Sequence, residues 1–389
     1  MTHGHPLPAN PFYASTTQRI ALARQRYFEE GIRPSGMVSE AVIQSWARCL
    51  QARRDPSQPV DFEPVTPSRM HSALRLNQQL LAAAADEMAR LQYTLAGTSS
   101  TAILTDAQGM IINSTFVQAR SHERLMPVTT RIGVNLSEDA VGTTAPGVTA
   151  RTARPCIVSG AEHYFGNAQM MHCAAAPIHD IRGQLAGALD LSSEGLPFGF
   201  DAGSVVGHYA AEIENRLLCA QSTEHLVVRM QITPNLLDTP MAGLAGITGD
   251  GRLDWCNGAA AQLLGLQERG CVEAHFGVPL STLIGWSTSA QPHPLPLPNG
   301  LTLWVRCDWR SRDGHRGLHA VTPEPAALSA SVAEPAGNTM SLRETEHQAI
   351  VRALSEHGGN VSKTARALGV SRGRVYRHLR ADAAPDRAP

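Results

Sequence analysis

The chain has 389 residues, 33 basic and 34 acidic side chains and a formal net charge of −1. Its length favours two or three domains of about 100–200 residues each. A hydrophobic content of 43% excludes wholesale disorder. Every basic residue except Lys363 is an arginine, and serine precedes that lysine where the nucleotide-binding P-loop requires glycine. The composition therefore excludes P-loop nucleotide binding.

The seven cysteines are spread along the chain, and no two of them form a C-x-x-C pair. This spacing excludes the common zinc and dithiol motifs and favours reduced thiols. The N-terminal segment lacks the basic and apolar regions of a secretory signal. No apolar run approaches the roughly 20 residues of a membrane helix. We therefore expect a cytoplasmic protein that makes no contact with a membrane.

Residues 1–97 have the apolar spacing of a helical segment. Ser39 is the expected N-cap of a helix that carries Trp46 on its apolar stripe, where tryptophan is more often core than binding surface. A longer helix is expected from about Arg69 to Leu95.

Residues 98–222 change to short strands with inserted helices, a pattern typical of an α+β sensor domain. A helix interrupted by Gly142 and Gly147 is expected over 138–153, and another begins at Ala202. Strands are expected at 101–113 (two, around a turn at Asp106–Gly109), 156–160, 172–178 and 184–192.

Residues 236–322 form a second predicted α/β unit. Its expected elements are a hairpin through Gly249–Gly251, a short helix at Ala260–Leu264, and closing strands in LTLWVRCDW and GLHAVT. Residues 323–340 are rich in Ala, Pro, Ser and Glu, which predicts a flexible linker. The fold class is therefore multidomain α+β, followed by an all-α unit at the C-terminus.

Residues 341–381 predict a helix-turn-helix DNA-binding domain. Asn360 caps the second helix, Gly369 makes the tight turn, and Ser371 caps the third helix. Arg372 lies at the N-terminal end of the third helix, where an arginine can read guanine in the major groove. Phosphate contacts are expected from the other arginines, the lysine and the helix caps. The predicted DNA-binding residues are Asn360, Ser362, Lys363, Ser371, Arg372, Gly373, Arg374 and Arg377.

The charge is distributed unevenly between the two ends of the chain. Residues 341–389 hold nine Lys/Arg and five Asp/Glu, a net of +4, whereas residues 1–340 hold 24 and 29, a net of −5. This basic end supports DNA binding.

Several motifs resemble those of a known family. GGNVSKTARALGVSRGRVYRHLR (358–380) is similar to the Fis-type helix-turn-helix of bacterial enhancer-binding regulators. VIQSWARCL (42–50), LAGTSSTAILTDAQG (95–109) and IGVNLSEDAVGTTAPGVT (132–149) resemble the N-terminal part and GAF sensor domain of acetoin-catabolism-type regulators, which are sigma-54 activators. Residues 236–322 lie where a PAS-like module could follow. The resemblance implies a homodimer that binds double-stranded DNA at an inverted repeat and responds to a small-molecule effector.

The sequence departs from this family in its centre. Full-length members carry an AAA+ ATPase with a phosphate loop and a G-A-F-T-G-A loop, and neither motif occurs here. The resemblance therefore implies a sensor joined to a DNA-binding domain without the AAA+ ATPase domain. Its further partners would be RNA polymerase or a full-length activator.

Glu162, His163, His172 and Cys173 form the candidate ligand site within the GAF-like segment. The alternative is a capped turn beside a packed strand, with Cys173 as a small core residue. Transition-metal spacing is absent, so we expect no metal, no cofactor and no catalytic residue. Asp190 is expected to end a strand by accepting backbone N–H bonds.

Three hypotheses follow. The leading one is a transcriptional regulator. The second is an interaction protein that modulates a full-length activator through mixed dimers. The third is a GAF-type enzyme acting on a small oxidised or cyclic molecule, for which the sequence offers no catalytic cysteine pair or carboxylate dyad.

Overall fold

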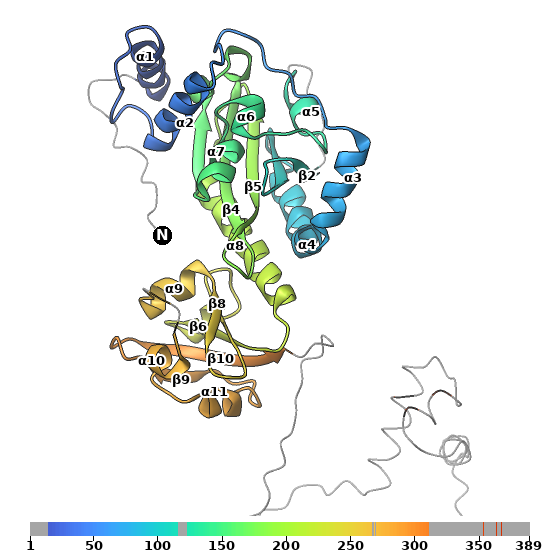
Figure 1. The fold of residues 1–389 in the computed structure, drawn as a ribbon, viewed down its shortest axis with the longest axis vertical. Helices are drawn as coiled ribbons and strands as arrows, with labels where there is room; N and C mark the ends of the chain where they lie inside the picture. The colour runs from blue at the N-terminus through green and yellow to red at the C-terminus, as the bar shows by residue number, and fades with distance from the viewer. Residues whose placement is uncertain are drawn as a thin grey trace, which may run out of the picture. The chain divides into compact units, whose positions relative to one another are not determined.

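The computed structural model describes residues 15–115, 123–266, 268, 270–310, Ala353, Lys363 and Ala367. Two compact units comprise residues 1–321 and 322–389, and the second unit lies almost wholly outside the described residues. Within the first unit, Figure 1 shows two five-stranded sheets with helix α8 (Ala202–Gln221) reaching from one to the other. The predicted mixture of helix and sheet is confirmed. Among the described residues, no helix has both the length and the apolar character needed to cross a membrane.

The first sheet is antiparallel throughout and has the strand order β2-β1-β5-β4-β3. The predicted turn after its first strand is confirmed, because Gly109 donates its N–H to the Asp106 carbonyl at 3.0 Å. Gly109 has a φ of +83°, which glycine adopts without strain. The strands are β1 (Ser100–Asp106), β2 (Ile111–Ser114), β3 (Cys156–Ser159), β4 (Met171–His179) and β5 (Leu185–Glu194).

The two faces of the first sheet pack against different helices. On the first face, Leu189 and Leu191 of β5 share a core with α4 (Gln78–Leu95) and α8. On the second face, Cys173 of β4 shares a core with α2 (Glu40–Gln51) and α7 (Ala145–Thr152). Because successive strand residues point to opposite faces, the residues that alternate with the two leucines point to the second face.

The N-terminal helices are α1 (Thr16–Phe28), α2, α3 (Pro67–Leu76) and α4. The predicted cap of α2 is confirmed, because Ser39 Oγ accepts the Val42 N–H at 3.3 Å. The single helix predicted from Arg69 to Leu95 is wrong. Asn77 breaks it, and its side-chain amide donates to the Ala73 carbonyl at 2.9 Å. Asparagine often competes with the helix in this way by bonding to nearby backbone groups.

Short helices fill the connections of the first sheet. The predicted interruption at Gly142 is confirmed by its φ of +69°. The predicted interruption at Gly147 is wrong, because this residue lies inside α7. A Cβ at this position would lie 2.6 Å from the Leu136 carbonyl oxygen, so glycine is needed for close packing and does not break the helix. These elements are α5 (Met126–Thr129), α6 (Glu138–Val141), α7 (Ala145–Thr152), η1 (Gly160–Glu162) and η2 (Gly166–Ala168).

Helix α2 is part of the core on the second face of the first sheet. Ser45 Oγ lies 2.8 Å from Thr143 Oγ1. Arg48 donates from Nε and Nη2 to the two carboxylate oxygens of Glu138, each at 2.7 Å. Trp46 is fully buried, as its apolar stripe predicted. The N-terminal helical segment therefore shares a core with the first sheet.

The second sheet has the strand order β8-β7-β6-β10-β9 and is also antiparallel. The predicted hairpin through Gly249–Gly251 and the helix after it are confirmed. Strand β6 belongs to this sheet although it precedes residue 236, and the predicted strand GLHAVT lies outside the described residues. Its elements are β6 (His225–Gln231), η3 (Pro234–Leu236), β7 (Gly243–Ile247), β8 (Leu253–Cys256), α9 (Gly258–Leu264), α10 (Val272–Phe276), α11 (Leu280–Trp286), β9 (His293–Pro296) and β10 (Thr302–Arg310).

Candidate functional site

Four buried polar side chains form a network on the second face of the first sheet. Ser192 Oγ lies 2.6 Å from Asp190 Oδ2 and 3.2 Å from Cys173 Sγ. Cys173 Sγ lies 3.5 Å from Nε2 of His163, and Nδ1 of the same ring lies 3.0 Å from the Gly160 carbonyl. None of the four side chains belongs to a residue more than 5% exposed.

The strand pattern explains how this network forms. Cys173 of β4 lies directly opposite Ser192 of β5 in the sheet register. Asp190 and Ser192 alternate with apolar residues along β5, so both point to the second face. His163 reaches the same place because η1 turns the chain back after β3. Three separate segments therefore supply the four side chains.

The protons of the network form one directed chain when Asp190 is protonated. Asp190 then donates to Ser192, Ser192 to Cys173, and Cys173 to Nε2 of His163, whose Nδ1–H donates to the Gly160 carbonyl. An ionised Asp190 has no proton to give, so the single serine hydroxyl proton turns toward it, and the sulfur then keeps only the Ala145 backbone N–H as a donor. The geometry therefore accommodates a neutral carboxylic acid at Asp190.

The surroundings favour the uncharged form of each titratable group in the network. Burial raises the pKa of Asp190 to about 7, against an opposing effect of the Ser192 hydrogen bond. Burial lowers the pKa of His163 to about 4. Burial also raises the pKa of the Cys173 thiol well above its ordinary value, with the nearby Asp190 carboxyl acting in the same direction. At neutral pH the imidazole and the thiol are therefore uncharged.

Helices α1 and α2 hold the turn that carries His163. Arg24 of α1 donates to the carbonyl oxygens of His163 at 2.8 Å and Tyr164 at 2.7 Å. Trp46 of α2 donates its Nε1–H to the Glu162 carbonyl at 2.7 Å. Partial burial lowers the pKa of Arg24, but an arginine side chain is not deprotonated in proteins, so the guanidinium stays charged. The position of the imidazole thus depends on residues more than a hundred positions earlier in the chain.

The four predicted ligand-site residues have different surroundings in the structure. His163 and Cys173 are brought together. The Glu162 carboxylate instead accepts the Ser159 N–H at 2.8 Å in a capping box, and burial raises its pKa to about 7. His172 lies on β4 next to Cys173, and burial lowers its pKa. Within the described part of the chain, Nδ1 of His172 has no hydrogen-bond partner.

The expectation for Asp190 is wrong. It does not end a strand by accepting backbone N–H bonds; it lies in the middle of β5 and contacts the Ser192 hydroxyl. The sequence analysis also missed Ser192 and Arg24. The alternation in ALDLSSE was the available signal, since it places an acid and a hydroxyl on one face between buried leucines.

The network suits recognition better than covalent catalysis. A nucleophilic cysteine needs a lowered pKa and access to solvent, and Cys173 has neither. Two buried oxygens, Asp190 Oδ1 and Thr149 Oγ1, lack a hydrogen-bond partner among the described residues. Thr149 lies on α7, which packs on β4 and β5. Across the residues that the structure describes, no group of three His, Cys, Asp or Glu side chains is arranged to hold a metal ion.

The predicted DNA-binding residues lie outside the described residues, with the exception of Lys363. Lys363 and Ala367 are helical and exposed. Ala353 is helical and 6% exposed, and the rest of the predicted helix-turn-helix lies outside the described residues.

Both ends of the chain match families of bacterial regulators. Residues 15–196 match the MimR N-terminal domain, and residues 341–381 match the Fis family of bacterial regulatory proteins. The chain carries a MimR-type N-terminal domain and a Fis-type helix-turn-helix. The MimR-type domain spans α1 through β5, which agrees with the core that α2 shares with the first sheet.

Two curated relatives extend this finding. The chain is 28% identical over 231 residues to the acetoin catabolism regulatory protein of Cupriavidus necator, which covers 58% of this chain and 34% of that protein. It is 23% identical over 341 residues to the propane 2-monooxygenase operon transcriptional activator MimR of Mycolicibacterium goodii, which covers 84% of this chain and 55% of that protein. The chain thus spans between a third and about half of these relatives' lengths. Its resemblance to acetoin-catabolism-type regulators is confirmed, and both relatives are named as regulators, not as enzymes.

A solved structure is also similar to the described part of the chain. A chain from the crystal structure of the E. coli DhaR(N)–DhaL complex matches with a TM-score of 0.44 and 16% identity. The match covers 69% of this chain and 99% of that one.

Proposed function

We propose that the protein is a sequence-specific DNA-binding transcriptional regulator controlled by a small-molecule effector. The observation that carries the proposal is a Fis-type segment at 341–381 on the same chain as a MimR-type domain at 15–196. The net charge of +4 over 341–389, from nine basic and five acidic residues, supports binding to DNA phosphates. A homodimer would place one Fis-type unit on each half of an inverted repeat.

The effector would bind a GAF-type first module, on the second face of its sheet. Asp190 Oδ1 and Thr149 Oγ1 support this location, because a buried acceptor without a partner costs roughly 1–3 kcal/mol. A small molecule with hydroxyl or amide donors would satisfy both oxygens. The module at residues 225–310, PAS-like in this proposal, would then pass the change toward the linker and the DNA-binding unit.

The regulator would act without ATPase activity of its own. The only lysine in this sequence is Lys363, so no P-loop lysine is available for a nucleotide phosphate. It would therefore recruit or block RNA polymerase directly, and could also cooperate with a full-length activator. Dimer geometry is the expected carrier of the signal, because the linker predicted from the composition of residues 323–340 would transmit strain poorly but would set effective concentration.

Arg372→Ala is expected to weaken binding to the cognate operator by about ten- to a hundredfold and to relax the preference at one base pair. The reason is the loss of a bidentate contact to guanine, worth roughly 1–3 kcal/mol. Gel shifts with the operator and its single-base variants measure both effects. Arg374→Ala is the matched control, since losing a phosphate contact weakens binding equally for all sequences. Unchanged affinity and preference in Arg372→Ala would remove this arginine from base readout.

Modulation of a full-length activator through mixed dimers is the second candidate function. It is favoured by a chain that matches only 34–55% of the length of two relatives yet carries a regulator-type domain at each end. Co-purification with a full-length regulator, together with loss of the effect at the promoter in its absence, would favour this candidate. Full regulation by this chain alone would exclude it.

A further inference from the structure

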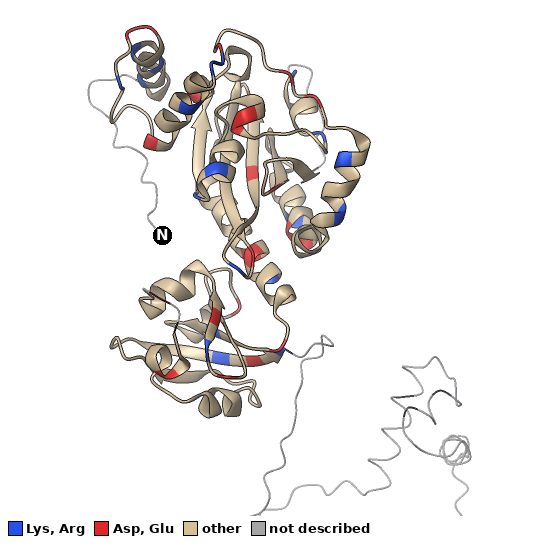
Figure 2. Ribbon diagram, viewed as in Figure 1, with Lys and Arg blue, Asp and Glu red and all other residues tan. Residues whose placement is uncertain are grey.

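A groove of about 660 Å³ lies between α8 and the face of the second sheet that α8 covers. It is lined by four arginines and three carboxylates, and its neutral lining includes Ser289 and Thr239. Figure 2 shows basic and acidic positions along β10, the strand that supplies several of them. The charged lining residues are Glu212, Arg216, Arg229, Asp238, Arg306, Asp308 and Arg310.

Two arginines face each other across the strands in this groove. Arg229 of β6 is the direct register partner of Arg306 of β10. Both side chains are largely buried, at 20% and 22% exposure. Like charges directly opposite each other in a sheet are destabilising, more so when water is partly excluded. Two carboxylates, Asp238 and Asp308, lie beside this pair and offset the repulsion.

The groove's own carboxylates satisfy these arginines incompletely. Arg306 forms a two-pronged pair with Asp238, with one contact at 3.1 Å, but that aspartate is 70% exposed. Arg229 forms a long ion pair with Asp308, 3.8 Å from Nε to the carboxylate oxygen, which is too far for a hydrogen bond. Nε of Arg310 is buried and has no hydrogen-bond partner among the described residues. The two contacts with Asp238 show that the Arg306 guanidinium is oriented to bind an oxyanion. Because Asp238 is exposed, another oxyanion can take its place.

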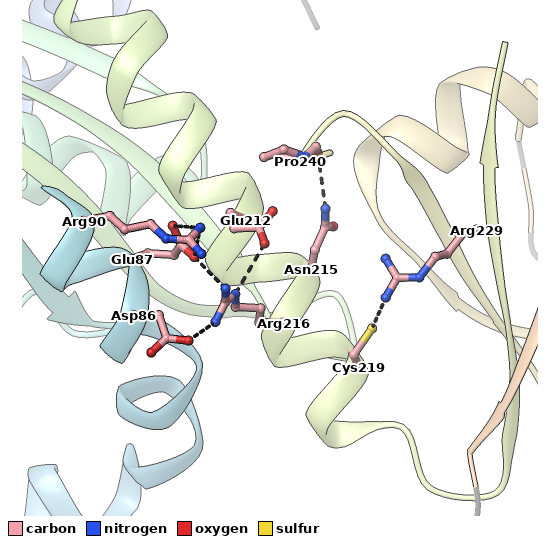
Figure 3. Close-up of polar contacts among 9 residues, drawn as sticks. All are labelled: Asp86, Glu87, Arg90, Glu212, Asn215, Arg216, Cys219, Arg229 and Pro240. Atoms are coloured by element: carbon pink, nitrogen blue, oxygen red, sulfur yellow. Dashed lines mark hydrogen bonds and ion pairs between the residues drawn. The ribbon is translucent and has the colours of Figure 1, made fainter. Parts of the chain in front are cut away.

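Helix α8 connects this groove to the MimR-type domain, as Figure 3 shows. On one side, Arg216 pairs with Asp86 at 2.6 Å and Glu87 at 2.9 Å, both on α4. One helical turn further along α8, the sulfur of Cys219 lies 3.7 Å from the Arg229 guanidinium. An anion bound at Arg229 would therefore lie beside α8, and α8 shares a core with α4 and the first sheet.

We propose that this groove is a second ligand site, which binds a compact oxyanion, a carboxylate or a phosphate, on Arg229, Arg306 and Arg310. The ligand displaces the exposed Asp238 from Arg306 and bridges the cross-strand arginine pair, in which Arg229 contacts Asp308 only at 3.8 Å. Guanidinium groups recognise carboxylate and phosphate through paired hydrogen bonds, so both anion types fit the same three side chains. The site is separate from the Asp190 network on the first sheet.

The test is isothermal titration of the full chain with inorganic phosphate and, separately, with succinate, at ionic strength held constant with sodium chloride. We expect saturable binding of at least one anion, and the stronger of the two identifies the ligand's chemical class. Arg306→Gln should weaken that binding by about tenfold or more, since it removes charge-assisted hydrogen bonds. Asp238→Asn should strengthen it several-fold, because the competing internal carboxylate is gone.

Arg252→Gln is the matched control, because Arg252 is exposed on the same module and does not line the groove. It should bind as the unmodified chain does. Absence of saturable binding by both anions would overturn the proposal, and so would equal losses in Arg306→Gln and Arg252→Gln. Asp238→Asn keeps the test valid if Arg306→Gln fails to fold, since weaker binding in that variant also contradicts the proposal. No DNA is present, so failure here leaves the proposed regulatory function untouched.

Discussion

Trp46→Ala is expected to destabilise the MimR-type domain by about 3–5 kcal/mol, the usual cost of removing a large buried aromatic side chain. Trp46 is 0% exposed, and its ring centroid lies 5.3 Å from that of Tyr27 and 5.1 Å from that of Phe28. It also donates the hydrogen bond that holds the Glu162 carbonyl. The substitution therefore loses packing on α1 and one bond to the turn before His163.

Urea unfolding followed by circular dichroism measures this loss of stability. Trp46→Phe is the informative companion, because it keeps most of the packing but removes the indole N–H, and we expect it to cost clearly less. Tyr93→Ala serves as the control, since Tyr93 is 87% exposed and its loss should change stability by less than about 0.5 kcal/mol. A Trp46→Ala protein as stable as Tyr93→Ala would show that α2 is not part of the domain's core.

The elements that sequence predicted correctly depend on local signals. Ser39 caps its helix through a residue three positions away, and Gly109 closes its turn within four residues. The wrong predictions occur where the local preference for helix and the preference against it are nearly equal. Asn77 broke a helix whose apolar stripe continues through it, and Gly147 stayed helical because tight packing against the Leu136 carbonyl requires glycine there. A single sequence does not show which of these effects prevails.

The candidate site was harder to predict because it is assembled across long sequence separations. His163 and Cys173 are ten residues apart and were predicted within one four-residue site, but Arg24 holds the same turn from 139 residues away. Ser192 contacts Cys173 through the sheet register, which periodicity alone does not fix. The charged groove has the same origin, since Arg229 and Arg306 become neighbours only when β6 pairs with β10.

The unmodified protein is expected to lose about 3 kcal/mol of unfolding free energy through Asp190 between pH 5 and pH 8. Asp190→Asn is expected to remove this loss. Burial raises the pKa of Asp190 from 3.8 to about 7. Between these two pKa values the folded protein holds a proton that the unfolded chain has released. The stability that this proton contributes is therefore complete below about pH 4 and is lost as the pH rises to about 7, and asparagine removes this dependence.

The free energy of unfolding of each protein is measured at pH 5 and at pH 8. The effect is the change between the two pH values in the unmodified protein minus the same change in Asp190→Asn. His163 and Glu162 also have pKa values shifted by burial, to about 4 and about 7, but they titrate in both proteins and so cancel. At pH 5 the variant should be slightly less stable, because the amide leaves one buried N–H without an acceptor. Infrared difference spectra supply an independent reading, since protonated Asp190 gives a carboxylic acid C=O band that disappears in the variant. A pH dependence that is identical in the two proteins would mean that Asp190 is already ionised at pH 5, and the directed proton chain to His163 would then be wrong.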